Sequence, residues 1–101
     1  TTTPRLMPPA ERRAFEVIED GVRLSRYGGD CYAYCMVAAG HVDLVIESGL
    51  KPYDIVALVP IIEGAGGIIT NWKGESAASG GAIIAAGDKR VHEQALKLLN
   101  Q

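Results

Sequence analysis

Segments with helical hydrophobic periodicity alternate along the chain with short strand-like segments, and glycine or proline separates most of them. The expected helices cover residues 10–20, 31–39, 55–64 and the stretch after Asp88, and the expected strands cover residues 22–26, 42–47, 68–72 and 82–86. Alternation of this kind favours a sheet with helices packed on both faces. We therefore predict an α/β fold, a three-layer αβα sandwich with a mixed or parallel sheet.

Two of the expected helices have features that predict how they pack. Residues 31–39 are apolar all round, which is typical of a helix that is buried on most sides. Residues 55–64 include Pro60, whose ring clashes with the carbonyl of Val56 and should kink the helix. The run Gly64-Ala-Gly-Gly67 is then expected to end that helix.

The composition excludes several classes of protein. The formal net charge is −2 and the 10 lysines and arginines are scattered, whereas a nucleic-acid-binding surface needs a basic stripe. No uncharged apolar run approaches the roughly 18 residues that a membrane helix needs. Cys31 and Cys35 lie four residues apart, which favours two buried thiols in a reducing compartment over a disulfide or a zinc site. We expect a soluble, cytoplasmic protein that binds neither nucleic acid nor membrane.

Three carboxylates, those of Asp30, Glu47 and Asp54, stand at the ends of expected elements. Taken singly, each has a structural explanation, since Asp30 and Asp54 could be helix N-caps and Glu47 could be solvated at a strand end. Taken together, they lie after strands and at helix starts, where α/β sheets bind ligands. Carboxylate oxygens are ligands that Mg²⁺ prefers, and a helix N-terminus keeps an aspartate ionised. The pattern favours a shared site that includes a divalent cation.

Other polar and aromatic residues carry weaker signals. His41 follows Gly40 and could cap helix carbonyls, and His92 lies on a polar helix face, where we expect it to be solvated. Neither histidine is expected to act in catalysis. Trp72 favours packing over ligand stacking, and the small residues 76–81 favour a flexible turn over a phosphate-binding loop.

The sequence from Glu47 to Gly67, ESGLKPYDIVALVPIIEGAGG, resembles the second signature of the inositol monophosphatase superfamily. In that signature an Asp, usually after an aromatic residue, precedes an apolar helix that ends in Glu-Ala-Gly-Gly. Tyr53 stands where the superfamily usually has Trp, and Gly64 interrupts the usual ending. Upstream, residues 26–34 (RYGGDCYAY) and 38–43 (AAGHVD) resemble the histidinol-phosphate phosphatase branch more than the inositol branch.

The resemblance implies roles for particular residues. Asp54 would bind a Mg²⁺ ion, while Glu47 and Asp30 would hold the alcohol part of the substrate, with Gly29 and Cys31 as further substrate contacts. Histidinol phosphate carries an ammonium group, and two carboxylates suit a cation better than a neutral polyol. The implied activity is hydrolysis of histidinol phosphate to histidinol, a step of histidine biosynthesis. The alternatives are an inositol-1-monophosphatase and a non-catalytic ligand-binding domain.

The first signature of the superfamily, an Asp-Pro-x-Asp-Gly-Thr stretch with an upstream Glu, does not occur in residues 1–101. In the superfamily that signature supplies most metal ligands and the groups that activate water. Residues 1–101 are therefore expected to be a single carboxy-terminal domain without the catalytic amino-terminal lobe, and to be inactive alone. The implied partners are a small phosphorylated metabolite, the amino-terminal lobe of the same protein and a second copy in a homodimer.

Overall fold

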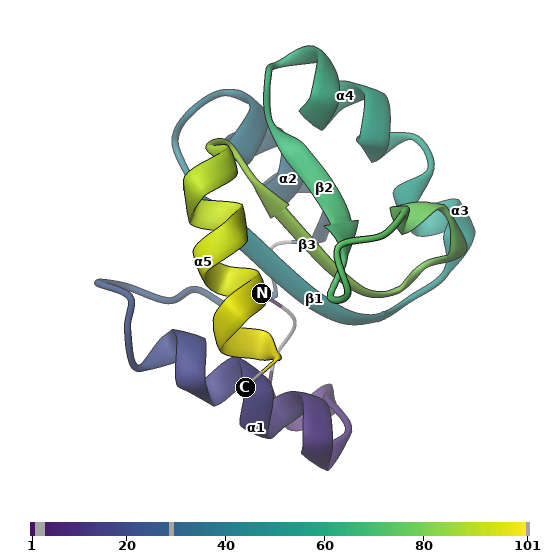
Figure 1. Ribbon diagram of the computed structural model, residues 1–101. Coiled ribbons are helices and arrows are strands. Elements are labelled where there is room, and N and C mark those ends of the chain that lie inside the picture. The colour runs from purple at the N-terminus through teal and green to yellow at the C-terminus, as the bar shows by residue number, and fades with distance from the viewer. Residues whose placement is uncertain (2–3, 29, 101) are drawn as a thin grey trace.

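A computed structural model describes residue 1, residues 4–28 and residues 30–100 (Figure 1). Its helices are α1 (Pro9–Glu19), α2 (Asp30–Ala38), α3 (Pro52–Ile55), α4 (Leu58–Gly64) and α5 (Lys89–Leu99), its strands are β1 (Leu44–Leu50), β2 (Ile68–Asn71) and β3 (Gly81–Ala86), and its 3₁₀ helices are η1 (Pro4–Leu6) and η2 (Ala77–Ser79). The strands form one sheet in the order β1-β3-β2. No helix within the described ranges is long and apolar enough to cross a membrane.

Helices cover both faces of the sheet, which confirms the predicted three-layer αβα sandwich. Helices α2, α3 and α4 pack on one face, where their apolar side chains form a core with Val45 of β1 and Ile83 of β3. Helices α1 and α5 pack on the opposite face against Ile46 and Ile84. Neighbouring residues of β1 and β3 enter different cores because side chains alternate along a strand. Both isoleucines of β3 are fully buried, and each contributes about 1.5–3 kcal/mol to folding.

The pairing of the sheet differs from the prediction. Strands β1 and β2 are both antiparallel to β3, so the described strands pair in antiparallel fashion only, not in a parallel or mixed sheet. Residues 22–26, predicted as a strand, form none, and Leu24 is 71% exposed. A strand needs a neighbour that satisfies its backbone groups. Beside the end of this segment, the amino group of Thr1 donates to the Arg26 carbonyl over 3.1 Å, and the Thr1 carbonyl accepts from the Gly28 N–H over 2.9 Å. These two bonds are too little pairing for a strand.

Residues 55–64, predicted as one kinked helix, belong to two helices. Helix α3 ends at Ile55 and α4 begins at Leu58. Pro60 lies in the first turn of α4, where its missing N–H removes no helical hydrogen bond, and Val56 lies before that helix. The proline therefore helps to set where α4 begins. The predicted end of the helix is confirmed, since Gly66 has φ 86° and the next N–H, of Gly67, donates to a carbonyl of α4 over 2.9 Å.

Helix α2 is buried on one side only, which corrects the prediction for residues 31–39. Tyr34 and Val37 enter the core, whereas Tyr32 is 68% exposed. Cys35 is an exposed free thiol, so the prediction of a buried thiol is wrong at this position, and the side chain of Cys31 lies outside the described part of the chain. Apolar side chains make up a large share of ordinary protein surfaces, so an all-apolar helix need not be enclosed.

The two histidines differ from their predictions. After α2, Gly40 has φ 85°, and the backbone N–H of His41, not its imidazole, donates to a carbonyl in the last turn over 2.9 Å. His92 was expected to be solvated but is 3% exposed, with Nε2 2.8 Å from Oγ1 of Thr70 on β2. The Thr70 hydroxyl donates to a backbone carbonyl over 2.7 Å, so Nε2 of His92 is the donor to Thr70.

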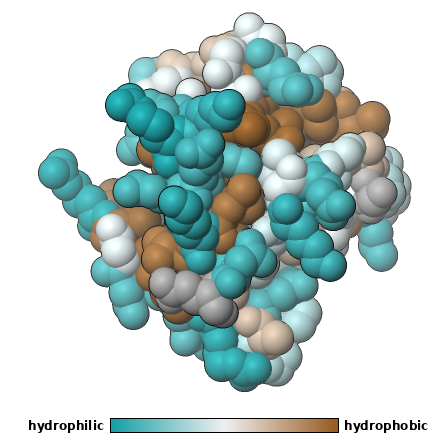
Figure 2. All heavy atoms as spheres, viewed as in Figure 1, coloured by the Kyte–Doolittle hydropathy of each residue, from teal (hydrophilic) through white to brown (hydrophobic). Residues whose placement is uncertain are grey.

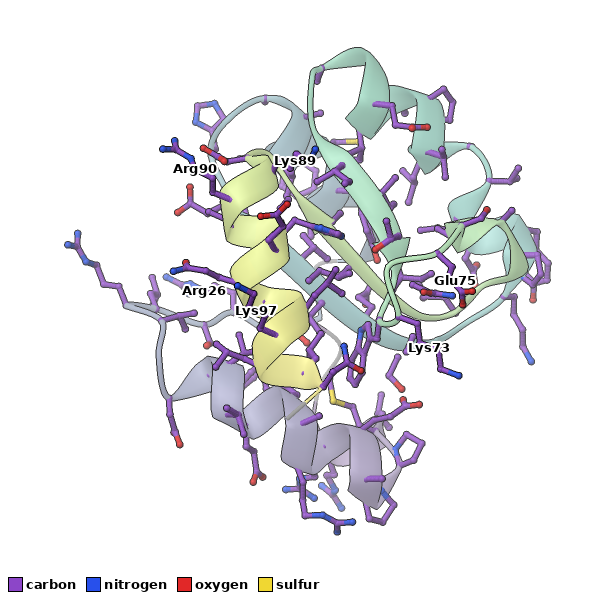
Figure 3. All side chains as sticks on the ribbon, in the orientation of Figure 1. Arg26, Lys73, Glu75, Lys89, Arg90 and Lys97 are labelled. Atoms are coloured by element: carbon purple, nitrogen blue, oxygen red, sulfur yellow. The ribbon has the colours of Figure 1, made fainter. Side chains whose placement is uncertain are left out.

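Helix α5 has a polar outer surface and an apolar inner one. Figure 2 shows mostly hydrophilic side chains over this helix, and Figure 3 shows Arg90 and Lys97 directed away from the sheet. The predicted cap is confirmed, because the Asp88 carboxylate accepts from the backbone N–H of Arg90 over 2.7 Å. On the inner side, Trp72 is buried and its Nε1 donates to the Ile83 carbonyl over 3.1 Å, which confirms its packing role.

Candidate active site

Strand β1 ends irregularly, and this irregularity shapes the candidate site. Glu47 pairs with Ile83 of β3, but the next pairing begins at Leu50, so the register shifts between them. Gly49 in this bulge has φ 75°, a conformation that favours glycine. Because Val45 and Ile83 lie in the core beneath α2, Glu47, two residues after Val45, is directed to the same face.

The Glu47 carboxylate is buried against Tyr34 of α2. Glu47 is 6% exposed, so the alternative of a solvated strand end is wrong. Tyr34 is 1% exposed, and its burial, then the negative charge of Glu47, then the approach of its hydroxyl to the Glu47 carboxylate raise the pKa of its phenol. The Tyr34 hydroxyl makes no hydrogen bond of ordinary geometry within the part of the chain that the structure describes. A carboxylate and a protonated phenol are thus close together in low-dielectric surroundings.

Ser48 anchors the same stretch of β1 on the opposite face of the sheet. Its Oγ donates a hydrogen bond to Oε1 of Glu11, in the first turn of α1. Consecutive residues therefore contact different helix layers, Glu47 contacting α2 and Ser48 contacting α1. Sequence reasoning missed Tyr34, Ser48 and Glu11. Strand alternation indicates that Ser48 and Glu47 face opposite ways, but no local pattern identifies partners so distant along the chain.

Asp54 lies in α3, just after the loop that follows β1. The backbone N–H of Lys51 donates to Oδ2 of Asp54 over 2.9 Å, so this carboxylate satisfies a donor at the helix start. A capping interaction is therefore present, although Asp54 lies within the first turn and Lys51 is the N-cap residue. Asp54 and the neighbouring Tyr53 are both exposed, so a ligand could reach the carboxylate.

Gly80, next to η2, sets the path of the loop between Glu47 and Asp54. A Cβ atom at Gly80 would lie 2.5 Å from the carbonyl oxygen of Leu50 and 2.9 Å from the nitrogen of Pro52, and its φ is 74°. Both the contact and the dihedral angle require glycine. Residues 76–81, predicted as a flexible turn, thus pack directly against the loop of the candidate site.

The described residues fit one part of a magnesium site. No group of three or more His, Cys, Asp or Glu side chains within the described ranges could hold a metal ion. Asp54 offers an exposed carboxylate oxygen, the donor type that Mg²⁺ prefers, and Mg²⁺ is often bound through one or two carboxylates plus water and substrate phosphate. Asp54 therefore fits as one ligand, and a complete site requires further donors.

The other predicted substrate contacts lie at the start of α2. The helix begins at Asp30, one turn before Tyr34, which places the helix start on the side of the sheet that carries Glu47. Gly29 lies outside the described residues, as do the side chains of Asp30 and Cys31. Their roles as substrate contacts remain predictions.

A hollow of about 430 Å³ lies elsewhere, between the segment 22–27, the end of α1 and the start of β1. Neither Glu47 nor Asp54 lines it. We therefore treat it as separate from the candidate active site.

The fold and the candidate site define a class of protein, an α/β sandwich with carboxylates where a strand passes into a helix. Residues 4–101 match the inositol monophosphatase family, and the chain belongs to that family. The resemblance of residues 47–67 to the family signature is thereby confirmed.

Three relatives illustrate this membership. The chain is 51% identical over 98% of its length to a bifunctional phosphatase IMPL2, chloroplastic, of Arabidopsis thaliana, and covers 31% of that protein. It is 34% identical over 91% of its length to a histidinol-phosphatase of Mycobacterium tuberculosis, of which it covers 35%. Its fold matches an inositol monophosphatase from Zymomonas mobilis with a TM-score of 0.93 and 43% identity, over 99% of this chain and 40% of that one. The chain thus spans about a third of the length of these curated relatives.

Proposed function

We propose that the intact protein is a Mg²⁺-dependent phosphomonoesterase that hydrolyses histidinol phosphate to histidinol and inorganic phosphate. The observation that carries this proposal is the buried carboxylate of Glu47, in a family member similar to a protein named histidinol-phosphatase. In this proposal the described chain supplies the alcohol-binding side of the site through Glu47 and one metal ligand through Asp54.

Glu47 suits a substrate that carries an ammonium group. A carboxylate with 6% exposure attracts a cation more strongly than a solvated one, because the effective dielectric constant around it is low. Hydrogen bonds between an ammonium and a carboxylate are stronger than those between neutral groups. Asp30, predicted to contact the same part of the substrate, would add a second negative charge. An uncharged polyol would bring no positive charge to these carboxylates.

In this proposal Asp54 acts on the phosphate side of the substrate. Its Oδ2 holds the start of α3 through Lys51, and its exposed carboxylate would hold Mg²⁺ together with donors from outside residues 1–101. When bound, Mg²⁺ would neutralise phosphate charge and activate the attacking water. The loop held by Gly80 would keep Asp54 and Glu47 at a constant separation, so that one substrate molecule could contact both.

Hydrolysis of inositol 1-phosphate is the second candidate function. The solved inositol monophosphatase from Zymomonas mobilis, with 43% identity to this chain, favours it. The carboxylate of Glu47 could accept hydrogen bonds from inositol hydroxyls, but these would lack the charge of an ammonium donor.

Steady-state kinetics of the intact protein with both phosphates test the proposal. We expect a higher kcat/KM for histidinol phosphate than for inositol 1-phosphate. Glu47→Gln should lower kcat/KM for histidinol phosphate by about ten-fold or more, the effect of losing a charged hydrogen-bond partner, and should change the inositol value much less. Equal losses on both substrates would refute the role of Glu47 in recognising the ammonium group.

We further propose that the intact protein acts in the cytoplasm as a homodimer. The exposed free thiol of Cys35 supports a reducing compartment. The exposed apolar side chains of Val56 and Ile61 support contact of this helix layer with further protein. Light scattering after size-exclusion chromatography would show twice the mass of the intact chain, and a monomeric mass would contradict the dimer.

A further inference from the structure

The hydroxyl of Tyr34 is an unexplained polar group in the core. The side chain is 1% exposed, and its hydroxyl has no hydrogen-bond partner among the described residues. A buried hydroxyl without a partner destabilises the folded state, and phenylalanine would fill almost the same volume without that cost. The phenol therefore requires a role beyond packing.

The group that the Tyr34 hydroxyl can serve is the carboxylate of Glu47. Helix α2 packs on β1, and Tyr34 and Val45 belong to one apolar core. Glu47 is directed to the same face of β1 as Val45 and is itself buried. The negative charge of Glu47 is among the causes that raise the pKa of Tyr34, so the two groups are near each other. At neutral pH the phenol is protonated and can donate a hydrogen bond.

We propose that Tyr34 is a positioning residue for Glu47, whose carboxylate its hydroxyl holds through a hydrogen bond once substrate is bound. Hydrogen bonds in an active site are often long or poorly aligned without substrate and tighten in the complex. A donor on one carboxylate oxygen would leave the other oxygen directed at the ammonium group. The bond between Ser48 and Glu11 holds the adjacent backbone from the opposite face, so contacts with both helix layers fix this stretch of β1. This inference rests on the proposed function.

The test is a double-mutant cycle in the intact protein with Tyr34→Phe, Glu47→Gln and the combined variant. Tyr34→Phe should raise KM for histidinol phosphate about ten-fold, with KM for inositol 1-phosphate changed less than about two-fold. Adding Tyr34→Phe to Glu47→Gln should cause no further loss, because the phenol acts through the carboxylate. The matched control is Tyr32→Phe, which removes an exposed hydroxyl from the same helix and should change neither KM.

Thermal unfolding separates positioning from a structural role. Tyr34→Phe should leave Tm unchanged or raise it, because the lost hydroxyl has no hydrogen-bond partner among the described residues. A marked fall in Tm with equal losses on both substrates, or additive effects of Tyr34→Phe and Glu47→Gln, would overturn the inference. If Glu47→Gln discriminates between the substrates but Tyr34→Phe does not, the inference fails and the proposed function stands. If Glu47→Gln affects both substrates equally, the proposed function fails and the positioning role fails with it.

Discussion

The replacement Asp54→Asn separates metal binding from helix capping at one side chain. The backbone N–H of Lys51 donates to Oδ2 over 2.9 Å, and the amide oxygen of asparagine can accept the same bond. Asparagine and aspartate stabilise helix starts about equally through such bonds. The lost charge near the helix N-terminus costs about 0.3–1 kcal/mol, and α3 is only one turn long. We therefore expect Tm of the intact protein to fall by less than about 4 °C.

The expected loss of activity is much larger. A carboxylate ligand contributes negative charge that a neutral amide oxygen lacks, and Mg²⁺ favours charged oxygen donors. Charge stabilisation by a bound metal is worth several kcal/mol in the transition state, and 1.36 kcal/mol corresponds to a factor of ten. We expect kcat for histidinol phosphate to fall about 100-fold or more, and the Mg²⁺ concentration for half-maximal rate to rise about ten-fold.

Asp88→Asn is the matched control for this experiment. Asp88 is the N-cap of α5 and accepts from the Arg90 N–H over 2.7 Å, but it lies at a helix that packs on the other face of the sheet from α3. Asp88→Asn should leave kcat and the Mg²⁺ dependence unchanged. Wild-type kcat and Mg²⁺ dependence in Asp54→Asn would show that Asp54 is only a cap, and the reasoning that places a metal at α3 would be refuted.

Two further predictions concern the stability of the fold. Gly80→Ala should lower Tm by several degrees and reduce kcat/KM, because the new Cβ would lie 2.5 Å from the Leu50 carbonyl oxygen and the residue has φ 74°. Unchanged Tm and kcat/KM would contradict this packing role. Burial lowers the pKa of His92 below its ordinary value of 6.5, and the negative charge of Glu93 opposes this shift. The unfolded chain therefore binds a proton more readily than the folded chain. The free energy of unfolding should fall as pH decreases below about 6.5. Denaturant unfolding at several pH values should show this dependence weakened in His92→Gln, whose amide can still donate to Thr70, and an equal slope in both proteins would exclude His92 as its source.

Helix ends could be predicted from the sequence because their signals are local. Asp88 caps α5 as expected, and the glycines after α4 end that helix through backbone hydrogen bonds that only nearby residues supply. A strand depends on a neighbouring strand that pairs with its backbone N–H and C=O groups. Residues 22–26 have an alternating pattern but no such neighbour in the described part of the chain, and they form no strand. The prediction that His92 is solvated was wrong for a similar reason. Its helical face is polar by pattern, but Thr70 on β2 supplies a partner that makes burial possible.

The candidate site divides in the same way between local and distant determinants. The family signature identifies Glu47 and Asp54, because both lie in one continuous stretch of sequence around the end of β1. The residues that surround Glu47 come from elsewhere, Tyr34 from α2 on one face and Glu11, through Ser48, from α1 on the other. The bulge after Glu47 ends the regular pairing with β3 just before the loop that leads to Asp54. A motif can therefore identify the groups that carry charge, while the surroundings of the Glu47 carboxylate depend on helix packing that only the folded structure shows.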